Sequence, residues 1–283
     1  ALFCIQRKAM FRTLLNLTVS CALLLSSIAH AGIVVESTRY LYKEGAREIT
    51  AQIENKDDIY GNIVANERDY TLTNDAVNGY TTTDVLNLVE KNDKAKNHLK
   101  QAETIVISVG GNDFLQLRNN LDFTEILEVI EKGKDSKMIK NMLKTVKQNL
   151  RSIHENIREL NPKAKIVLQT VYNPFLGQSD KFTELLCQLV EMFREDYTQI
   201  YFDEAKTDSN MIIADVEKTF RTYSNSTGNT SLVQNDYIHP SVKGHRIIAD
   251  LVEEAMDDVH KASWSSVQKS ANALVRLGCR MFE

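Results

Sequence analysis

The stretch TIVISVGGND, from Thr104 to Asp113, is the clearest structural signal in the chain. Its first six residues form a compact, mainly apolar run, which is typical of a strand buried on both faces of a sheet. The two glycines that follow allow a sharp exit from the strand, so that Asn112 stands just beyond the strand end. In open α/β sheets, ligands bind beyond the carboxyl ends of the strands. The stretch therefore predicts a buried strand followed by a ligand-binding loop.

Strands and helices alternate on both sides of this run, from about residue 60 to about residue 260. Short apolar runs predict strands, and apolar residues spaced by three and four predict amphipathic helices. The expected strands span residues 70–73, 104–109, 166–168 and 211–216, and the expected helices span residues 60–68, 83–90, 138–157, 182–200 and 242–259. This alternation favours an α/β domain in which helices cover both faces of a parallel sheet.

The composition is that of a globular protein and argues against several classes of function. Hydrophobic residues make up 43% of the 283 residues, which is enough for a full core, and the formal net charge is only −4. No stripe of Lys and Arg indicates nucleic-acid binding. The four cysteines lack the spacings of a zinc site or a disulfide framework. We therefore expect no nucleic acid, no metal and no cofactor.

Residues 1–31 have the pattern of a secretion signal. Arg7, Lys8 and Arg12 give a positive start, the run from Thr13 to Ile28 is mainly apolar, and Ala29-His30-Ala31 fits an A-x-A cleavage site. The apolar run is short for a membrane span, which needs about 20 residues. The pattern predicts export to the periplasm or the exterior, with no stable membrane span in the mature chain.

Residues 32–58 alternate with the period of a strand and predict a short β-hairpin-like segment. Thr38-Arg39, the turn glycine Gly45 and Asn55 resemble the mature N-terminus of periplasmic pilus-assembly chaperones. That resemblance implies that Arg39 binds the terminal carboxylate of a pilus subunit. The alternation ends at Asp58, however, whereas an immunoglobulin-like sandwich needs about seven strands.

Three short motifs carry groups suited to acyl-transfer chemistry. Gly79 directly precedes a predicted helix, where its N–H can donate to a developing oxyanion, and the carboxamide of Asn112 can do the same. Asp236 stands three residues before His239, and Pro240 stiffens the turn that holds them. A carboxylate so placed can accept from Nδ1–H of the imidazole and leave Nε2 free as a general base. Each motif alone is also typical of an ordinary turn or surface hydrogen bond.

Together, the motifs stand in the order of a known family. The chain resembles the SGNH, or GDSL-like, hydrolases in three of the four sequence blocks of that family: Gly79, Gly110-x-Asn112-Asp113 and Asp236-x-x-His239-Pro240. The resemblance implies a flavodoxin-like three-layer sandwich that hydrolyses small-molecule, lipid or sugar esters, or thioesters, by a serine mechanism. It also implies that His239 is the base, Asp236 its orienting partner, and Gly79 and Asn112 two of the oxyanion donors.

The family's fourth block, Gly-Asp-Ser after the first strand, does not occur ahead of Gly79. The nearest stand-in for the nucleophile is Ser37, but Val35 stands where the family has glycine. A β-branched residue does not easily adopt the strained turn of a nucleophile elbow. We therefore predict an ester hydrolase with weak or no activity. Two alternatives remain open: a non-catalytic ligand-binding pseudo-hydrolase that keeps the pocket, and a fragment of a periplasmic pilus chaperone.

These patterns divide the chain into four parts. We expect a signal peptide at residues 1–31, a chaperone-like β segment at residues 32–58, an SGNH hydrolase-like domain at residues 59–260, and a C-terminal tail at residues 261–283.

Overall fold

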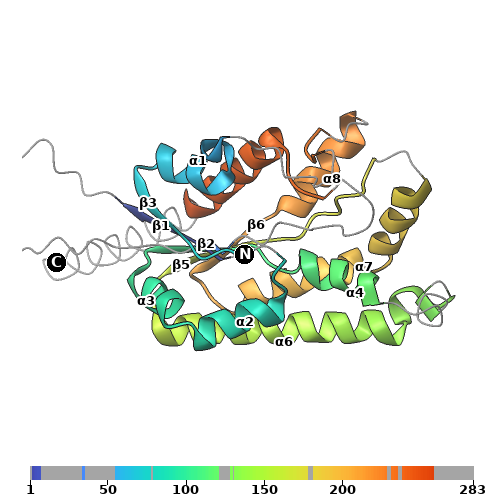
Figure 1. The fold of residues 1–283 in the computed structure, drawn as a ribbon, viewed down its shortest axis with the longest axis horizontal. Helices are drawn as coiled ribbons and strands as arrows, with labels where there is room; N and C mark the ends of the chain where they lie inside the picture. Colours follow the sequence, from blue (N-terminus) through green and yellow to red (C-terminus); the bar gives the residue numbers. More distant parts are fainter. Residues whose placement is uncertain are drawn as a thin grey trace, which may run out of the picture.

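The computed structural model describes residues 2–7, 34–35, 55–77, 79–120, 128–129, 131–177, 181–227, 231–234 and 238–257. In this part of the chain, a central sheet lies between two layers of helices (Figure 1). The α/β class and the three-layer arrangement expected from the sequence are confirmed.

The sheet has the strand order β3-β1-β4-β5-β6, and β2 also pairs with β4. Its strands are β1 (Leu2–Arg7), β2 (Val34–Val35), β3 (Tyr70–Asn74), β4 (Thr104–Ile107), β5 (Lys165–Gln169) and β6 (Met211–Ala214). The strands β4, β5 and β6 are parallel and aligned, so that Val106 lies beside Val167 and Val167 beside Ile212. Because parallel strands point the same way, their carboxyl ends meet at one edge of the sheet.

The strand β1 is the antiparallel member of this sheet. It pairs antiparallel with both β3 and β4, so β3 and β4 run in the same direction on either side of it. The short strand β2 instead pairs parallel with β4, with Val34 beside Val106 and Val35 beside Ile107. The expected parallel sheet is thus present in β3 to β6, with β1 inserted among these strands. Residues 2–7 lie within the segment that the sequence assigns to a signal peptide, an assignment that stays a prediction.

The helices follow the strands as the sequence pattern predicts, with some additions. They are the 3-10 turns η1 (Lys56–Asp58) and η2 (Gly133–Asp135) and the α-helices α1 (Tyr60–Glu67), α2 (Thr82–Lys91), α3 (Asp93–Gln101), α4 (Gly111–Asn120), α6 (Lys137–Leu160), α7 (Lys181–Ala205) and α8 (Val216–Thr227). Residues 242–257 are also helical. The helices α3, α4 and α8 are not expected from the sequence.

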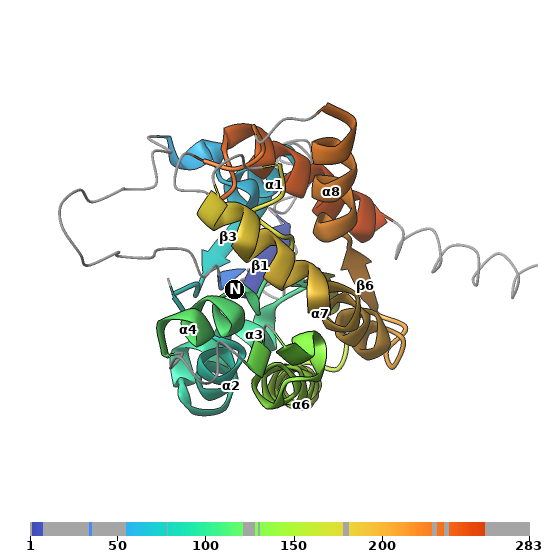
Figure 2. The same cartoon turned by 90° about the vertical axis from the view of Figure 1, so that its right-hand side faces the viewer.

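Alternate residues of β4 face different helix layers and so divide the core in two. Ile105 and Ile107 belong to the larger cluster, together with buried residues of α2, α3, α6 and α7. Val106 belongs to the second cluster, together with buried residues of α1, α8 and the helix at residues 242–257. Figure 2 shows α2 and α6 on one side of the sheet and α1 and α8 on the other. The site therefore rests on a sheet that is covered on both faces.

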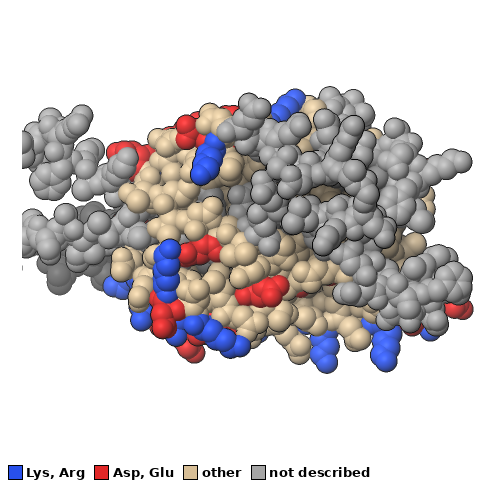
Figure 3. Space-filling view, in the orientation of Figure 1, with Lys and Arg blue, Asp and Glu red and all other residues tan. Residues whose placement is uncertain are grey.

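Charged side chains of both signs are mixed on the visible surface. On the face in Figure 3, Lys and Arg alternate with Asp and Glu over α2 and α3, and the described residues of this face form no basic stripe. In the part of the chain that the structure describes, no helix has the length and apolarity needed to cross a membrane.

Candidate active site

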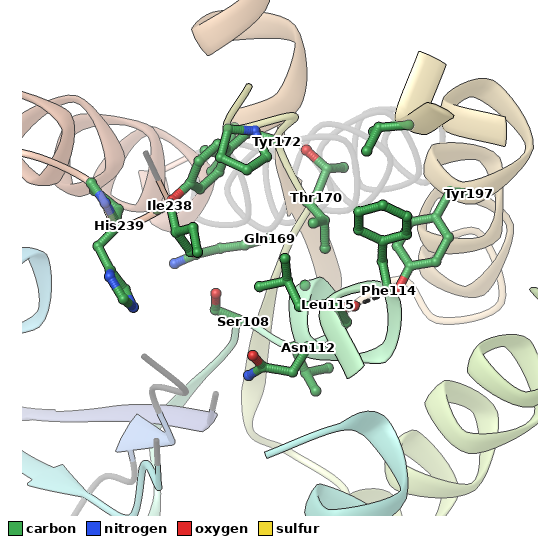
Figure 4. A pocket seen from close by; sticks show the side chains of 18 of the residues that line it. Ser108, Asn112, Phe114, Leu115, Gln169, Thr170, Tyr172, Tyr197, Ile238 and His239 are labelled. Atoms are coloured by element: carbon green, nitrogen blue, oxygen red, sulfur yellow. Dashed lines mark hydrogen bonds between the residues drawn. The ribbon is translucent and has the colours of Figure 1, made fainter. Parts of the chain in front are cut away.

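A pocket of about 130 Å³ lies at the carboxyl ends of β4 and β5 (Figure 4). Its lining comes from residues at or beyond the carboxyl ends of β4 and β5, from α4 and α7, and from the segment Ile238 to Pro240, with single residues of α1, α8 and the helix at residues 242–257. A parallel sheet is expected to bind ligands at this edge. The pocket holds both Asn112 and His239, two residues that the sequence predicts to act together.

The GGND motif turns the chain from β4 into α4. Gly110 has a φ of +114°, and Gly111 is the first residue of α4. A Cβ on Gly110 would lie 2.0 Å from Oη of Tyr201 and 2.7 Å from Oη of Tyr197. These two hydroxyls donate to the carbonyl oxygens of Val109 and Gly110, each at 2.7 Å. Backbone conformation and the close approach of α7 therefore both require glycine at residue 110.

The segment that contains Gly79 lies against the first turns of α4. Nδ2 of Asn112, which is buried, donates to the carbonyl oxygen of Tyr80 at 3.0 Å. Nε2 of Gln116 donates to the carbonyl oxygen of Gly79, also at 3.0 Å. Gly79 has a φ of +81°, a conformation that favours glycine. These bonds bring the expected oxyanion donors, Gly79 and Asn112, into neighbouring segments, although Gly79 is not itself among the residues that line the pocket.

Asp113 joins α4, which carries Asn112, to the start of α2, which follows Gly79. Its carboxylate accepts hydrogen bonds from the backbone N–H of Thr82 at 2.9 Å and from the Thr82 hydroxyl at 2.6 Å. Nδ2 of Asn149 on α6 donates to the same hydroxyl at 3.0 Å. Burial raises the pKa of Asp113 to about 6, although the hydrogen bonds from Thr82 act in the opposite direction. The sequence motif includes Asp113 but gives no indication of this partner.

His239 lies in a loop that is fixed by backbone contacts. The bridge between Val233 and Pro240 closes the loop, and the backbone N–H of Gln234 donates to the carbonyl oxygen of His239 at 2.7 Å. The Tyr172 hydroxyl donates to the carbonyl oxygen of Ile238 at 2.6 Å. The side chain of His239 is 6% exposed and lines the pocket. Asp236 lies outside the described residues, so its contact with His239 stays a prediction.

Other lining residues are not indicated by the sequence motifs. Gln169 ends β5 and Ser108 follows β4, and Figure 4 shows both side chains between His239 and Asn112. Phe193 and Tyr197 line the pocket from α7. The four-residue spacing of Phe193, Tyr197 and Tyr201 is visible in the sequence and predicts one helix face, but it does not say what that face contacts.

No group of three or more His, Cys, Asp or Glu side chains among the described residues is arranged to hold a metal ion. Cys187 is a free thiol of α7 near a second hollow, and burial raises its pKa, which disfavours the reactive thiolate.

A family model described as GDSL-like lipase/acylhydrolase matches residues 40–252, more than half of the chain. The chain belongs to the GDSL-like lipase/acylhydrolase family. The resemblance stated from the sequence motifs is thereby confirmed.

Relatives of this GDSL-like chain are distant. The uncharacterized protein YpmR of Bacillus subtilis (strain 168) is 26% identical over 186 residues, which cover 65% of each chain. The chain thus spans about two thirds of the length of the curated relative that it matches.

Two solved structures have the same overall fold. The lipase Lip_vut3 from a goat rumen metagenome is 20% identical with a TM-score of 0.52, and the match covers 69% of this chain and 84% of the lipase. LAE5, an α/β hydrolase enzyme from the metagenome of Lake Arreo, Spain, is 15% identical with a TM-score of 0.51, and the match covers 82% of this chain and 98% of LAE5. At these identities the likeness concerns the fold alone.

Ser37, the candidate for the serine nucleophile of the GDSL family, lies outside the described residues. The strand β2, which ends at Val35, runs parallel to β4, so both strands point toward the edge of the sheet that carries the GGND turn.

Proposed function

We propose that this chain is an ester hydrolase with low turnover, in which His239 is the general base and Asn112 and Gly79 are oxyanion donors. Asp236 would accept from Nδ1–H of His239 and stabilise the imidazolium. The observation that carries the proposal is that Asn112 and His239 line one pocket beyond the carboxyl ends of β4 and β5. Substrates of the proposed reaction are small-molecule, lipid or sugar esters.

The reaction begins when Nε2 of His239 takes a proton from the attacking hydroxyl, whose oxygen then bonds to the ester carbonyl carbon. The carbonyl oxygen becomes an oxyanion. The amide of Asn112 has two N–H groups, and because one of them binds the Tyr80 carbonyl, the other remains to donate to this oxyanion. Collapse of the intermediate breaks the bond to the alcohol, which leaves with the proton from His239. A water molecule then releases the acyl group in the same way if the nucleophile is a side chain.

The attacking group is the part of the proposal that the sequence leaves open. Ser37 is the candidate side chain, and the parallel pairing of Val34–Val35 with β4 supports it. If no serine acts, water takes its place, and the remaining groups provide on the order of 10³- to 10⁴-fold acceleration over water. Val35 in the place of the family's glycine supports low turnover if Ser37 attacks, because a β-branched residue does not easily adopt the strained turn of a nucleophile elbow.

The alternative is a pseudo-hydrolase that binds ester-like ligands in the same pocket without reaction. The missing Gly-Asp-Ser tripeptide favours it. The two functions differ in turnover. A hydrolase turns over ester and loses this activity when His239 is substituted, whereas a pseudo-hydrolase has no activity to lose.

Hydrolysis of p-nitrophenyl butyrate at neutral pH by the purified chain, His239→Ala and Ser37→Ala tests the proposal. We expect slow hydrolysis that falls to background in His239→Ala. Loss in Ser37→Ala as well would identify the nucleophile, whereas no loss would indicate water or another serine, with Ser108 in the pocket the first to substitute. Equal background rates in all three proteins would overturn the proposed hydrolase and favour the ligand-binding pseudo-hydrolase.

Export is part of the same proposal. The order of positive charge, apolar run and small residues in residues 1–31 supports it. Cleavage after Ala31 would remove β1 from its place between β3 and β4 and leave the β2 segment as the strand beside β4. Mass spectrometry of the exported chain tests this, and an N-terminus ahead of residue 32 would contradict it.

A further inference from the structure

The pocket has two chemically different ends. His239, Ser108 and Gln169 contribute polar groups at one end, whereas Phe114, Leu115, Val190, Phe193 and Tyr197 line the other. Figure 4 shows Phe114, Leu115 and Tyr197 on the far side of Asn112 from His239. We call these five residues the acyl arm. An ester held with its carbonyl oxygen toward Asn112 and its alcohol toward His239 directs its acyl chain into this arm.

Aromatic rings that pack against one another line the far end of the acyl arm. Phe193 and Tyr197 are one turn apart on α7 and lie ring to ring, with centroids 5.9 Å apart. The ring of Phe193 also packs on that of Phe114, with centroids 5.3 Å apart. The Tyr197 hydroxyl donates to the carbonyl oxygen of Gly110 at 2.7 Å, and burial raises its pKa well above the usual value, so it remains a donor. This wall therefore has little freedom to yield to a longer chain.

The arm offers no free charge to a substrate. Arg194 contributes to the pocket lining, but its guanidinium pairs with carboxylates of Glu191 at 3.3 Å, Glu195 at 2.9 Å and Glu217 at 3.6 Å. An acyl chain that carried a second carboxylate at its far end would meet no unpaired cation in the arm, and this carboxylate would lose its hydration. The lining therefore selects an uncharged, apolar acyl group.

The size of the pocket limits the length of that group. The whole pocket, including the polar end that holds the ester group, has a volume of about 130 Å³. An apolar protein cavity of about 150 Å³ accommodates benzene, which has six carbon atoms. We propose that Phe193 and Tyr197 form the end wall of an acyl-binding arm that restricts substrates to acyl chains of no more than about six carbons. This inference rests on the proposed function, because it takes the ligand to be an ester positioned by Asn112 and His239.

Chain-length profiles of p-nitrophenyl esters from acetate to decanoate test the end wall. Each methylene that enters the arm raises kcat/KM by about fourfold, the factor that corresponds to burial of one CH₂. We expect this rise to stop at the butanoate or hexanoate ester and the value to fall for the octanoate. Phe193→Ala removes the ring and is expected to move the optimum to the octanoate or decanoate ester. Met192→Ala is the matched control, because Met192 is the neighbouring residue on α7 and is 42% exposed.

A second readout separates this inference from the enzyme proposal. Calorimetry measures the affinity for straight-chain carboxylates from butanoate to decanoate and needs no turnover. The affinity should show the same limit in chain length, and the same shift in Phe193→Ala, as kcat/KM does. Binding with that pattern but without turnover would support the arm and reject the enzyme.

An unchanged optimum in Phe193→Ala, in turnover and in binding, would overturn the arm, as would a parent profile that keeps rising to decanoate. If Phe193→Ala does not fold, Phe193→Leu keeps an apolar side chain and should move the optimum by a smaller step in the same direction.

Discussion

The imidazole of His245 lies nearly parallel to the ring of Tyr60, with centroids 5.8 Å apart and ring planes 17° apart. Its Nδ1 faces the backbone N–H of Tyr60 at 3.4 Å and so accepts a hydrogen bond in the neutral form. Burial, together with the nearby His239, lowers the pKa of His245 to about 4. The contact between Tyr60 and His245 joins the first turn of α1 to the helix at residues 242–257. His245 therefore has a structural role and is not among the residues that line the pocket.

We expect His245 to make the protein labile to acid. In the unfolded chain the imidazole binds a proton near pH 6.5, whereas in the folded chain it does so only near pH 4. The stability that it contributes is therefore present above pH 6.5 and is lost as the pH falls toward 4, by about 3 kcal/mol in total. His245→Asn keeps an acceptor and removes the titration. Urea denaturation of both proteins between pH 7 and pH 4 measures the effect, and a constant difference between them would contradict it.

Asp113 should act in the opposite direction with pH. Because its folded pKa is raised to about 6 from 3.8, the folded state binds its proton more tightly than the unfolded state does. The stability that this proton contributes is present below pH 3.8 and is lost as the pH rises through 6, by about 3 kcal/mol. The parent should thus lose stability relative to Asp113→Asn between pH 4 and pH 6. Parallel urea titrations test this, and a gain over that interval would show that Thr82 lowers the pKa more than burial raises it.

Much of the fold could be predicted because its pattern is local. The four residues of β4 are all buried, as a mainly apolar run predicts, and α6 buries residues spaced by three and four. The sequence does not predict α3, because this helix buries only Ala95 and Leu99 in a polar stretch. The sequence predicts a loop at the GGND motif, whereas Asn112 and Asp113 lie in the first turn of α4, where an acidic side chain is favourable.

The candidate site was predictable only in part, for the same reason. Gly79, Asn112 and His239 belong to motifs that can be matched in order along the chain. The contact between Tyr197 and Gly110 joins residues 87 positions apart, and no local pattern encodes it. The same holds for the two hydrogen bonds between Thr82 and Asp113, which follow from how α2 and α4 pack.

Asn112→Ala should reduce kcat much more than it changes KM. Loss of one oxyanion donor typically costs on the order of 10²- to 10³-fold in kcat, because the charge exists only in the transition state. With a slow parent enzyme, that loss would bring the rate to background. Asn87→Ala is the control, because Nδ2 of Asn87 also donates to a backbone carbonyl, that of Thr83 at 2.9 Å, on an exposed part of α2. A rise in KM with unchanged kcat would assign Asn112 to ground-state binding instead.

Gln169→Leu should separate stability from activity. Gln169 is 3% exposed, and its Nε2 finds no hydrogen-bond partner among the described residues. A buried donor without a partner costs about 1 to 3 kcal/mol, so an apolar side chain of similar size should leave the free energy of unfolding unchanged or raise it. Figure 4 shows this amide directed toward the His239 end of the pocket.

A donor in that position is suited to an oxygen of the ester, and we therefore expect kcat/KM to fall by about tenfold in Gln169→Leu, the value of one hydrogen bond of about 1.4 kcal/mol. Gln188→Leu, on an exposed position of α7, is the control and should change neither quantity. Thermal unfolding and p-nitrophenyl butyrate hydrolysis measure the two effects on the same samples. A loss of stability in Gln169→Leu would show that the amide has a partner within the folded chain, and unchanged kcat/KM would remove it from the site.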